Sequence, residues 1–149
     1  MKITIIAIGK LKERFWVDAC AEYLKRLQPY APTQVIELPD TNPEREAQAI
    51  AKALDKQGDR AHTILLAIDG KQRTSEDLSK HLDDLALHGT SEVTLIIGGS
   101  DGVTPAIRQR ADETLSFGPI TLPHNLARVV LLEQLYRTQK ISHHEPYHK

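Results

Sequence analysis

The chain has 149 residues, of which 40% are hydrophobic and 26% are charged, and its formal net charge is −1. This length and composition predict one globular domain covering residues 1–149, and they exclude disordered, collagen-like and coiled-coil proteins. The near-neutral charge argues against a nonspecific polyanion-binding protein, because such proteins carry a clear basic excess.

Apolar runs of strand length recur along the chain, and the segments between them are long enough to form helices. The runs are Ile3–Ile8, Gln34–Leu38, Ile64–Ile68 and Val93–Ile97, and a fifth short strand is expected at Thr114–Phe117. Because these runs are rich in Ile, Val and Leu, we expect strands of a mainly parallel sheet covered by helices on both faces. The predicted fold class is α/β.

Two helices are predicted between the first three strands. The first helix has apolar residues at spacings of three and four, and Pro29 ends it. This apolar stripe consists of Phe15, Trp16, Ala19, Cys20, Tyr23, Leu24 and Leu27. The second helix begins with Asn42 as its N-cap and Pro43 at the first helical position, and Gly58 ends it.

Helix start signals also follow the third and fourth strands. The segment from Thr74 to Asp77 resembles a capping box that opens a helix. The inner face of that helix consists of Leu78, Leu82 and Leu85. Thr104 followed by Pro105 starts a further helix after the fourth strand.

The last predicted helix, Asn125–Lys140, is apolar over most of its circumference. Its apolar residues are Leu126, Val129, Val130, Leu131, Leu132, Leu135 and Tyr136. Such a helix needs two apolar neighbours, and the sheet supplies only one of them. We expect a second subunit to supply the other, so the sequence predicts a homodimer built on this helix.

Neither a disulfide nor a membrane segment is expected. Cys20 is the single cysteine, and the short apolar run after Met1 and Lys2 is too brief for a signal peptide. No apolar run approaches the roughly 18 to 20 residues of a membrane span. We therefore expect a cytoplasmic protein without a membrane partner.

Three strand ends are candidates for a binding site, because ligands of parallel sheets bind beyond the carboxyl ends of the strands. They are Leu66–Gly70, Ile97–Gly102 and Phe117–Pro123. The glycine spacing of the second segment differs from a dinucleotide-binding fingerprint, so phosphate binding is poorly supported and a structural turn is the alternative. The third segment is apolar yet contains Gly118 and Pro119, which suits either a flat heteroaromatic group such as adenine or a buried connection.

The carboxyl-terminal segment Ile141–Lys149 contains three histidines but does not match a metal site. Adjacent His143 and His144 point apart in most backbone conformations, and Glu145 alone does not complete a ligand set, so no metal is expected. One interpretation of the segment is an exposed tail. The other is a nucleic-acid contact, in which Tyr147 stacks on a base and basic residues meet phosphates. The basic residues are Arg128, Arg137, His148 and Lys149.

Several segments carry a resemblance to one known family. They are Leu95–Gly102, Leu115–Phe117, Leu122–His124 with Arg128, Glu133–Arg137 and Pro146–Lys149. The whole chain resembles the bacterial 23S rRNA pseudouridine N3-methyltransferases, the ribosomal large subunit methyltransferase H family of the SPOUT superfamily. Asp101, His143 and His144 depart from the residues familiar at those positions. The resemblance implies an α/β fold with a carboxyl-terminal trefoil knot, which no sequence pattern alone predicts.

The same resemblance implies a homodimeric enzyme that uses S-adenosyl-L-methionine and no metal. The implied reaction is methylation of N3 of a pseudouridine in the helix 69 loop of 23S rRNA, on the assembled 70S ribosome. By carry-over, the cofactor-binding positions are Leu66, Gly98, Phe117, Gly118, Pro119, Ile120, Thr121 and Leu122. These positions fall within the three strand ends that physical reasoning selects.

Methylation at N3 requires that the imide proton leaves, since only then is the nitrogen lone pair available. His148 is the candidate base or proton acceptor, and Arg137 is the candidate for stabilising negative charge on a ring carbonyl. Tyr147 is the candidate for holding the extruded base by stacking. The proposed catalytic groups therefore lie in the last helix and the carboxyl-terminal segment.

Two other functions use the same sequence features. One is a flavodoxin-like or Rossmann-like enzyme that binds a nucleotide at the strand ends. The other is a ribosome-binding module that contacts RNA through its carboxyl-terminal segment and performs no chemistry. Binding of S-adenosylhomocysteine, compared with FMN and NAD, distinguishes the three.

Overall fold

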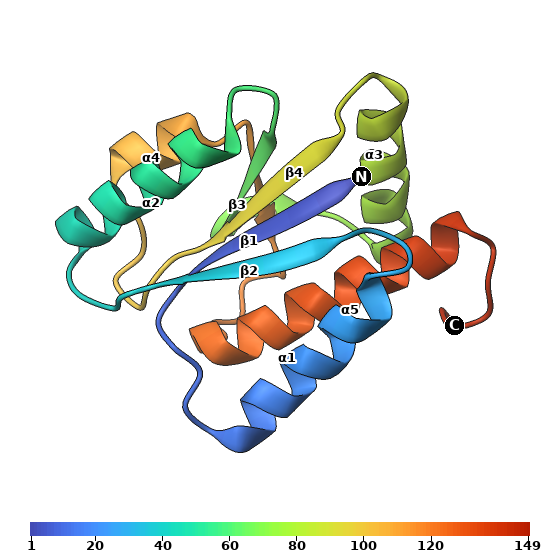
Figure 1. Ribbon diagram of the computed structural model, residues 1–149, viewed down its shortest axis with the longest axis horizontal. Coiled ribbons are helices and arrows are strands. Elements are labelled where there is room, and N and C mark those ends of the chain that lie inside the picture. The colour runs from blue at the N-terminus through green and yellow to red at the C-terminus, as the bar shows by residue number, and fades with distance from the viewer.

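Five parallel strands form the central sheet of the computed structural model, which describes residues 1–149 (Figure 1). The strands are β1 (Lys2–Ile8), β2 (Thr33–Leu38), β3 (His62–Gln72), β4 (Glu92–Ile97) and β5 (Glu113–Ser116). Their order in the sheet is β2-β1-β4-β3-β5, and every pairing is parallel. The predicted parallel α/β fold is confirmed, whereas the trefoil knot stays a prediction from the resemblance.

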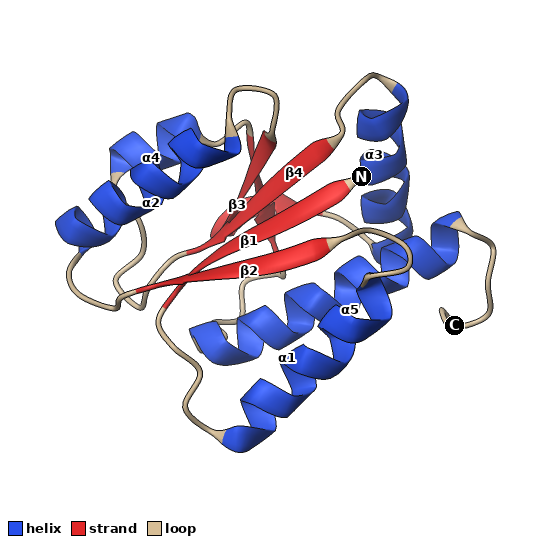
Figure 2. Ribbon diagram, viewed as in Figure 1, coloured by secondary structure: helices blue, strands red, loops and turns tan.

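Helices cover both faces of the sheet (Figure 2). They are α1 (Arg14–Leu27), α2 (Pro43–Gln57), α3 (Ser75–Leu87), α4 (Pro105–Arg110) and α5 (His124–Ser142). Alternate residues of β1 point to opposite faces, as the pleat of a strand requires. Ile3 and Ile5 join the core beneath α1, α3 and α5, while Ile6 and Ile8 join a second core beneath α2 and α4.

The helices begin where the capping residues predict. The side chain of Asn42 accepts a hydrogen bond from the Arg45 amide at 2.9 Å, and that of Thr74 accepts one from the Asp77 amide at 3.0 Å. Gly58 follows α2 with a φ of 83°, a left-handed value that favours glycine. The predicted helices are confirmed, and their boundaries shift by only a residue or two.

Phe15 corrects the prediction for α1. It was expected on the apolar inner stripe, but its side chain is 62% exposed, whereas Cys20 and Leu27 of the same stripe are buried. Phe15 belongs to the first turn of α1, which lies away from the sheet (Figure 1). The phenyl ring instead lies 4.8 Å from the ring of the neighbouring Trp16.

The expected second neighbour of α5 is found within the same chain. Helices α1 and α3 pack on either side of α5, so Leu131, Leu132 and Leu135 are fully buried without a second subunit. The expectation that only a second subunit could supply the other apolar neighbour of α5 was therefore wrong. Leu126 and Val130, nearer the start of α5, remain only half-buried. The homodimer itself stays a prediction.

None of the helices has both the length and the apolar character needed to cross a lipid bilayer.

Candidate functional site

The three strand ends selected from the sequence meet around one cavity of about 510 Å³. Residues from all three segments line it, because the carboxyl ends of parallel strands share one edge of the sheet. Seven of the eight expected cofactor-binding residues lie in its wall, namely Leu66, Gly98, Phe117, Gly118, Ile120, Thr121 and Leu122. Pro119 does not line the cavity and is exposed.

A serine joins two of these segments. The Ser116 hydroxyl donates to the Ile68 carbonyl at 2.8 Å and accepts a hydrogen bond from the Gly118 amide at 3.0 Å. The chain after β5 is therefore tied to the middle of β3, which continues to Gln72 instead of ending at Ile68 as the sequence predicts; its pairing with β5 shifts register between Leu66 and Lys71. A Cβ atom on Gly70 would lie 3.0 Å from the backbone of Leu115, so glycine is needed where the two strands approach closely.

The glycine-rich turn after β4 is shaped by packing. A Cβ atom on Gly98 would lie 2.8 Å from Cγ1 of Val103, and one on Gly99 would lie 2.8 Å from Oε1 of Glu46. Gly102, with a φ of 78°, closes the turn through a hydrogen bond from its amide to the Gly99 carbonyl at 3.0 Å. Glycine therefore allows this backbone to lie in the cavity wall.

The cavity combines apolar walls with unpaired backbone donors. Leu66, Leu115 and Phe117 supply apolar surface. The amides of Ile120 and Thr121 donate to no backbone carbonyl of the chain. Donors of this kind beside apolar surface suit the ring nitrogens of a flat heteroaromatic group.

His124 is a cavity residue to which sequence reasoning gave no role. It begins α5, and its buried Nδ1 atom has no hydrogen-bond partner in the chain. A Cβ atom on Gly9 would lie 3.1 Å from the imidazole Cε1, so Gly9 makes room for the ring. The available signal was its position, directly after the apolar segment that ends at Pro123.

The catalytic candidates Arg137, Tyr147 and His148 form a second cluster at the other end of α5. An Arg137 N–H donates to Nδ1 of His148 at 3.0 Å, and the guanidinium carbon lies 4.8 Å from the centre of the Tyr147 ring. The Tyr147 ring also lies edge-on to Tyr136, with 4.9 Å between ring centres. The structure thus brings the three predicted residues together.

Two carboxylates that the sequence analysis did not select hold this cluster. Oε1 of Glu133 accepts hydrogen bonds from Nη2 of Arg137 at 2.6 Å and from the Tyr147 hydroxyl at 3.1 Å. Glu76, on α3, pairs with Nε2 of His148. The spacing of Glu133 and Arg137, four residues apart on one helix, was a usable signal, whereas nothing local indicates the contact of Glu76.

The surroundings set the protonation of the cluster. Burial, together with the hydrogen bond to Glu133, raises the pKa of Tyr147 to about 12, so the phenol stays protonated at neutral pH. The hydrogen bond to Glu133 raises the pKa of Arg137 above its usual value. The hydrogen bond from His148 lowers the pKa of Glu76, which therefore stays ionised.

The cavity and the cluster are separate within one chain. Ala127 lines the cavity, while Arg137 lies ten residues further along α5, a rise of roughly 15 Å at 1.5 Å per residue. No residue of the carboxyl-terminal segment lines the cavity. A reaction that uses both therefore requires the segment to move or a second chain to supply it.

Arg128 corrects the prediction of a phosphate contact. Its side chain is only 3% exposed and pairs with Glu37 at 2.5 Å, and a further N–H donates to the Gly9 carbonyl at 3.0 Å. Arg128 therefore ties α5 to the chain around β1 and β2. The exposed-tail interpretation is also wrong for Tyr147 and His148, which pack against α5 and α3.

The chain matches known proteins over its full length. A family model described as "Predicted SPOUT methyltransferase" matches residues 1–148. The chain is 50% identical to "Ribosomal RNA large subunit methyltransferase H" of Bifidobacterium adolescentis and 49% identical to the protein of that name from Bacillus cytotoxicus. Each alignment covers 100% of both proteins.

Two solved structures share the fold at low sequence identity. The SpoU methyltransferase AviRb from Streptomyces viridochromogenes, in complex with AdoMet, aligns with a TM-score of 0.52 and 15% identity. That alignment covers 95% of this chain and 58% of AviRb. The A. aeolicus TrmH/SpoU tRNA modifying enzyme aligns with a TM-score of 0.51 and 14% identity, covering 99% of this chain and 81% of that one.

Proposed function

The chain belongs to the SPOUT methyltransferase family, and from this premise we propose that it methylates large-subunit ribosomal RNA with S-adenosylmethionine as methyl donor. The observation that carries the proposal is the meeting of three strand ends around one apolar cavity. The proposal is also supported by a relative named as a large-subunit rRNA methyltransferase, to which the chain is 50% identical over its whole length. We propose N3 of a pseudouridine in the helix 69 loop of 23S rRNA as the target.

The cavity residues fit the proposed cofactor. Leu66 and Phe117 offer apolar contact to its adenine ring, and the unpaired amides of Ile120 and Thr121 offer donors to the ring nitrogens. His124 adds a buried ring nitrogen without a partner. When bound, S-adenosylmethionine supplies an electrophilic methyl group on a sulfonium centre.

His148 is the proposed proton acceptor for N3, and its present contacts define how it becomes available. Arginine can only donate, so the Arg137 contact occupies the lone pair on Nδ1, and the proton on Nε2 faces Glu76. When the substrate N3–H replaces Arg137 as the hydrogen-bond donor to Nδ1, His148 can accept the N3 proton. The Arg137 N–H is then free to contact the ring carbonyl. Arg137 then stabilises the negative charge that develops on the ring carbonyl, while Glu76 stabilises the protonated imidazole.

Tyr147 is proposed to hold the extruded base by stacking rather than to move a proton. Its phenol stays protonated because its pKa is raised to about 12. The contacts with Tyr136 and Arg137 fix the orientation of the ring. A fixed aromatic ring suits a base that has left its own stack.

We propose a homodimer in which the carboxyl-terminal segment of one chain completes the cavity of the other. The separation of roughly 15 Å along α5 between Ala127 and Arg137 supports this arrangement, because one chain does not unite the two groups. The half-buried Leu126 and Val130, close to the cavity, offer apolar surface for the second chain.

The assembled 70S ribosome is the proposed substrate. A chain of net charge −1 lacks the basic surface that free RNA requires, so affinity must come from the shape and the protein surface of the ribosome. The test is incubation with labelled S-adenosylmethionine and either 70S particles or naked 23S rRNA, followed by mass spectrometry of the nucleosides. We expect N3-methylpseudouridine in the ribosomes only; no label in either substrate overturns the proposed function.

A further inference from the structure

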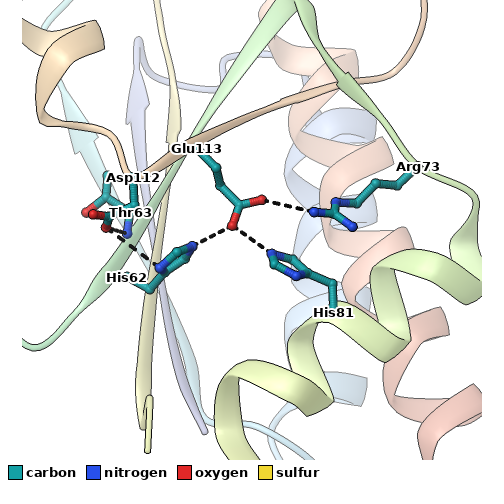
Figure 3. A network of polar contacts seen from close by, with 6 residues as sticks. All are labelled: His62, Thr63, Arg73, His81, Asp112 and Glu113. Atoms are coloured by element: carbon teal, nitrogen blue, oxygen red, sulfur yellow. Dashed lines mark hydrogen bonds and ion pairs between the residues drawn. The ribbon is translucent and has the colours of Figure 1, made fainter. Parts of the chain in front are cut away.

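Two histidines and a glutamate converge at the end of the sheet opposite the cofactor cavity (Figure 3). His62 is the first residue of β3 and Glu113 is the first residue of β5, whereas the cavity lies at the carboxyl ends of these strands. His81 comes from α3, which passes beside this corner of the sheet. None of the three residues has a part in the proposed methyl transfer.

The three side chains aim their donor atoms at a common point. Nε2 of His62 lies 2.5 Å from Oε2 of Glu113, and Nε2 of His81 lies 2.6 Å from the same oxygen. All three atoms lie within 4.8 Å of one another, and the three side chains are only 20 to 21% exposed. Two imidazole nitrogens and one carboxylate oxygen form a donor set that binds zinc in proteins.

The surrounding charges orient this donor set. Arg73 lies 3.6 Å from Oε1, the other oxygen of Glu113, so it holds the carboxylate and leaves Oε2 facing the histidines. Oδ2 of Asp112 lies 3.8 Å from Nδ1 of His62 and accepts the Thr63 amide at 2.7 Å. In the structure the Nε2 atoms of His62 and His81 both donate to the Glu113 carboxylate, so a metal ion binds in place of these two protons.

The positive charge of Arg73 acts against a cation, so we expect affinity in the micromolar range rather than that of a closed four-ligand site.

We propose that His62, His81 and Glu113 bind one divalent transition-metal ion of the zinc class, with water at the fourth position. Its ligands come from β3, β5 and α3, so the ion clamps α3 to the edge of the sheet. Because a ligand that binds only the folded chain stabilises it, bound metal raises the melting temperature. The site is independent of methyl transfer.

The test uses full-length protein without a histidine tag, freed of metal with a chelator that is then removed. Titration with Zn²⁺ is followed by calorimetry, and titration with Co²⁺ by its visible absorption, which reports the ligand geometry. We expect one ion per chain, tetrahedral Co²⁺ bands and a higher melting temperature with Zn²⁺. Mg²⁺ should have no effect, since it prefers oxygen ligands.

Variants decide whether these three residues are the ligands. His81→Ala and Glu113→Gln are each expected to weaken Zn²⁺ binding at least tenfold and to abolish the Co²⁺ bands. His88→Ala, which replaces the exposed histidine that caps the carboxyl end of α3, is the matched control and should bind as the parent does. The double variant of His143 and His144 to Ala should also bind normally.

Three outcomes overturn the proposal. One is the absence of saturable Zn²⁺ binding by the parent protein at millimolar concentration. Another is unchanged binding by folded His81→Ala, and the third is loss of binding in the variant of His143 and His144. If His81→Ala does not fold, His81→Gln keeps a donor toward Glu113 but not an imidazole ligand, and the same criteria apply to it.

Discussion

Arg137 donates a hydrogen bond to Nδ1 of His148 at 3.0 Å, so the proposed charge stabiliser occupies the lone pair of the proposed base. His148 cannot accept a proton at Nδ1 while this contact lasts. The structure therefore describes a resting arrangement, and binding of the target base must exchange one contact for another. Variants of the carboxyl-terminal residues should therefore lose methyl transfer while they keep cofactor binding.

Replacing Arg137 is expected to impair catalysis and to leave the cofactor cavity intact. Arg137→Ala removes the charge that stabilises the ring carbonyl, so kcat on 70S particles should fall by about 10²-fold or more. Affinity for S-adenosylhomocysteine, measured by calorimetry, should not change. Arg26→Ala is the matched control, because Arg26 also lies over tyrosine rings but has no proposed role. Equal losses in both variants would contradict the assignment.

Deletion of Pro146–Lys149 should abolish methylation while cofactor binding remains. The deletion removes Tyr147 and His148, whose contacts with Glu133 and Glu76 lie outside the cavity. The measurements are methyl transfer to 70S particles and binding of S-adenosylhomocysteine. Full activity of the shortened chain would mean that the segment is dispensable.

The carboxyl-terminal segment should loosen in acid. Hydrogen bonds from Lys140 and Tyr30 lower the pKa of Glu145 below its usual 4.5. The unfolded carboxyl group therefore binds a proton more readily than the folded one, so the stabilisation is fully present above about pH 4.5 and is lost as pH falls through the lower, folded pKa. Hydrogen exchange of the last five residues, measured against pH, should show this step, and Glu145→Gln should remove it. An unchanged step in that variant would assign the effect to another group.

Gly98 should tolerate a methyl group only if Val103 gives way. In Gly98→Ala the new Cβ would lie 2.8 Å from Cγ1 of Val103, so we expect a loss of about 1–3 kcal/mol in the free energy of unfolding and weaker cofactor binding. The double variant Gly98→Ala, Val103→Ala should recover much of the lost free energy of unfolding and much of the lost cofactor affinity. Gly89→Ala, whose Cβ meets nothing within 4 Å but whose φ of 98° is left-handed, measures the cost of backbone strain alone, which Gly98 does not carry. Failure of the second substitution to rescue would show that the contact with Val103 is not the cause.

Local signals predict most of the fold. Asn42 and Thr74 cap their helices through atoms three residues away, and the runs of Ile, Val and Leu are the buried strands. The cavity also follows from local signals, because parallel strands place their carboxyl ends at one edge. These features depend on neighbours in the sequence or on a general rule of the fold.

Contacts between distant segments could not be predicted in this way. Arg128 looks like a surface charge in the sequence, yet Glu37 neutralises it in the core. His62, His81 and Glu113 meet only because β5 pairs with β3 and α3 lies beside them, an order that hydrophobic pattern does not specify. The α1 and α3 neighbours of α5 were missed for the same reason.

The most direct test of a site shared between two chains is complementation between two inactive variants. Ala67→Phe fills the cavity with a ring and should abolish cofactor binding, while His148→Ala removes the proposed base. If the segment acts across the dimer, unfolding and refolding an equal mixture restores roughly a quarter of parental activity, because half of the dimers are mixed and each has one intact site. If each chain uses its own segment, the mixture stays as inactive as its components, and the two-chain site is contradicted.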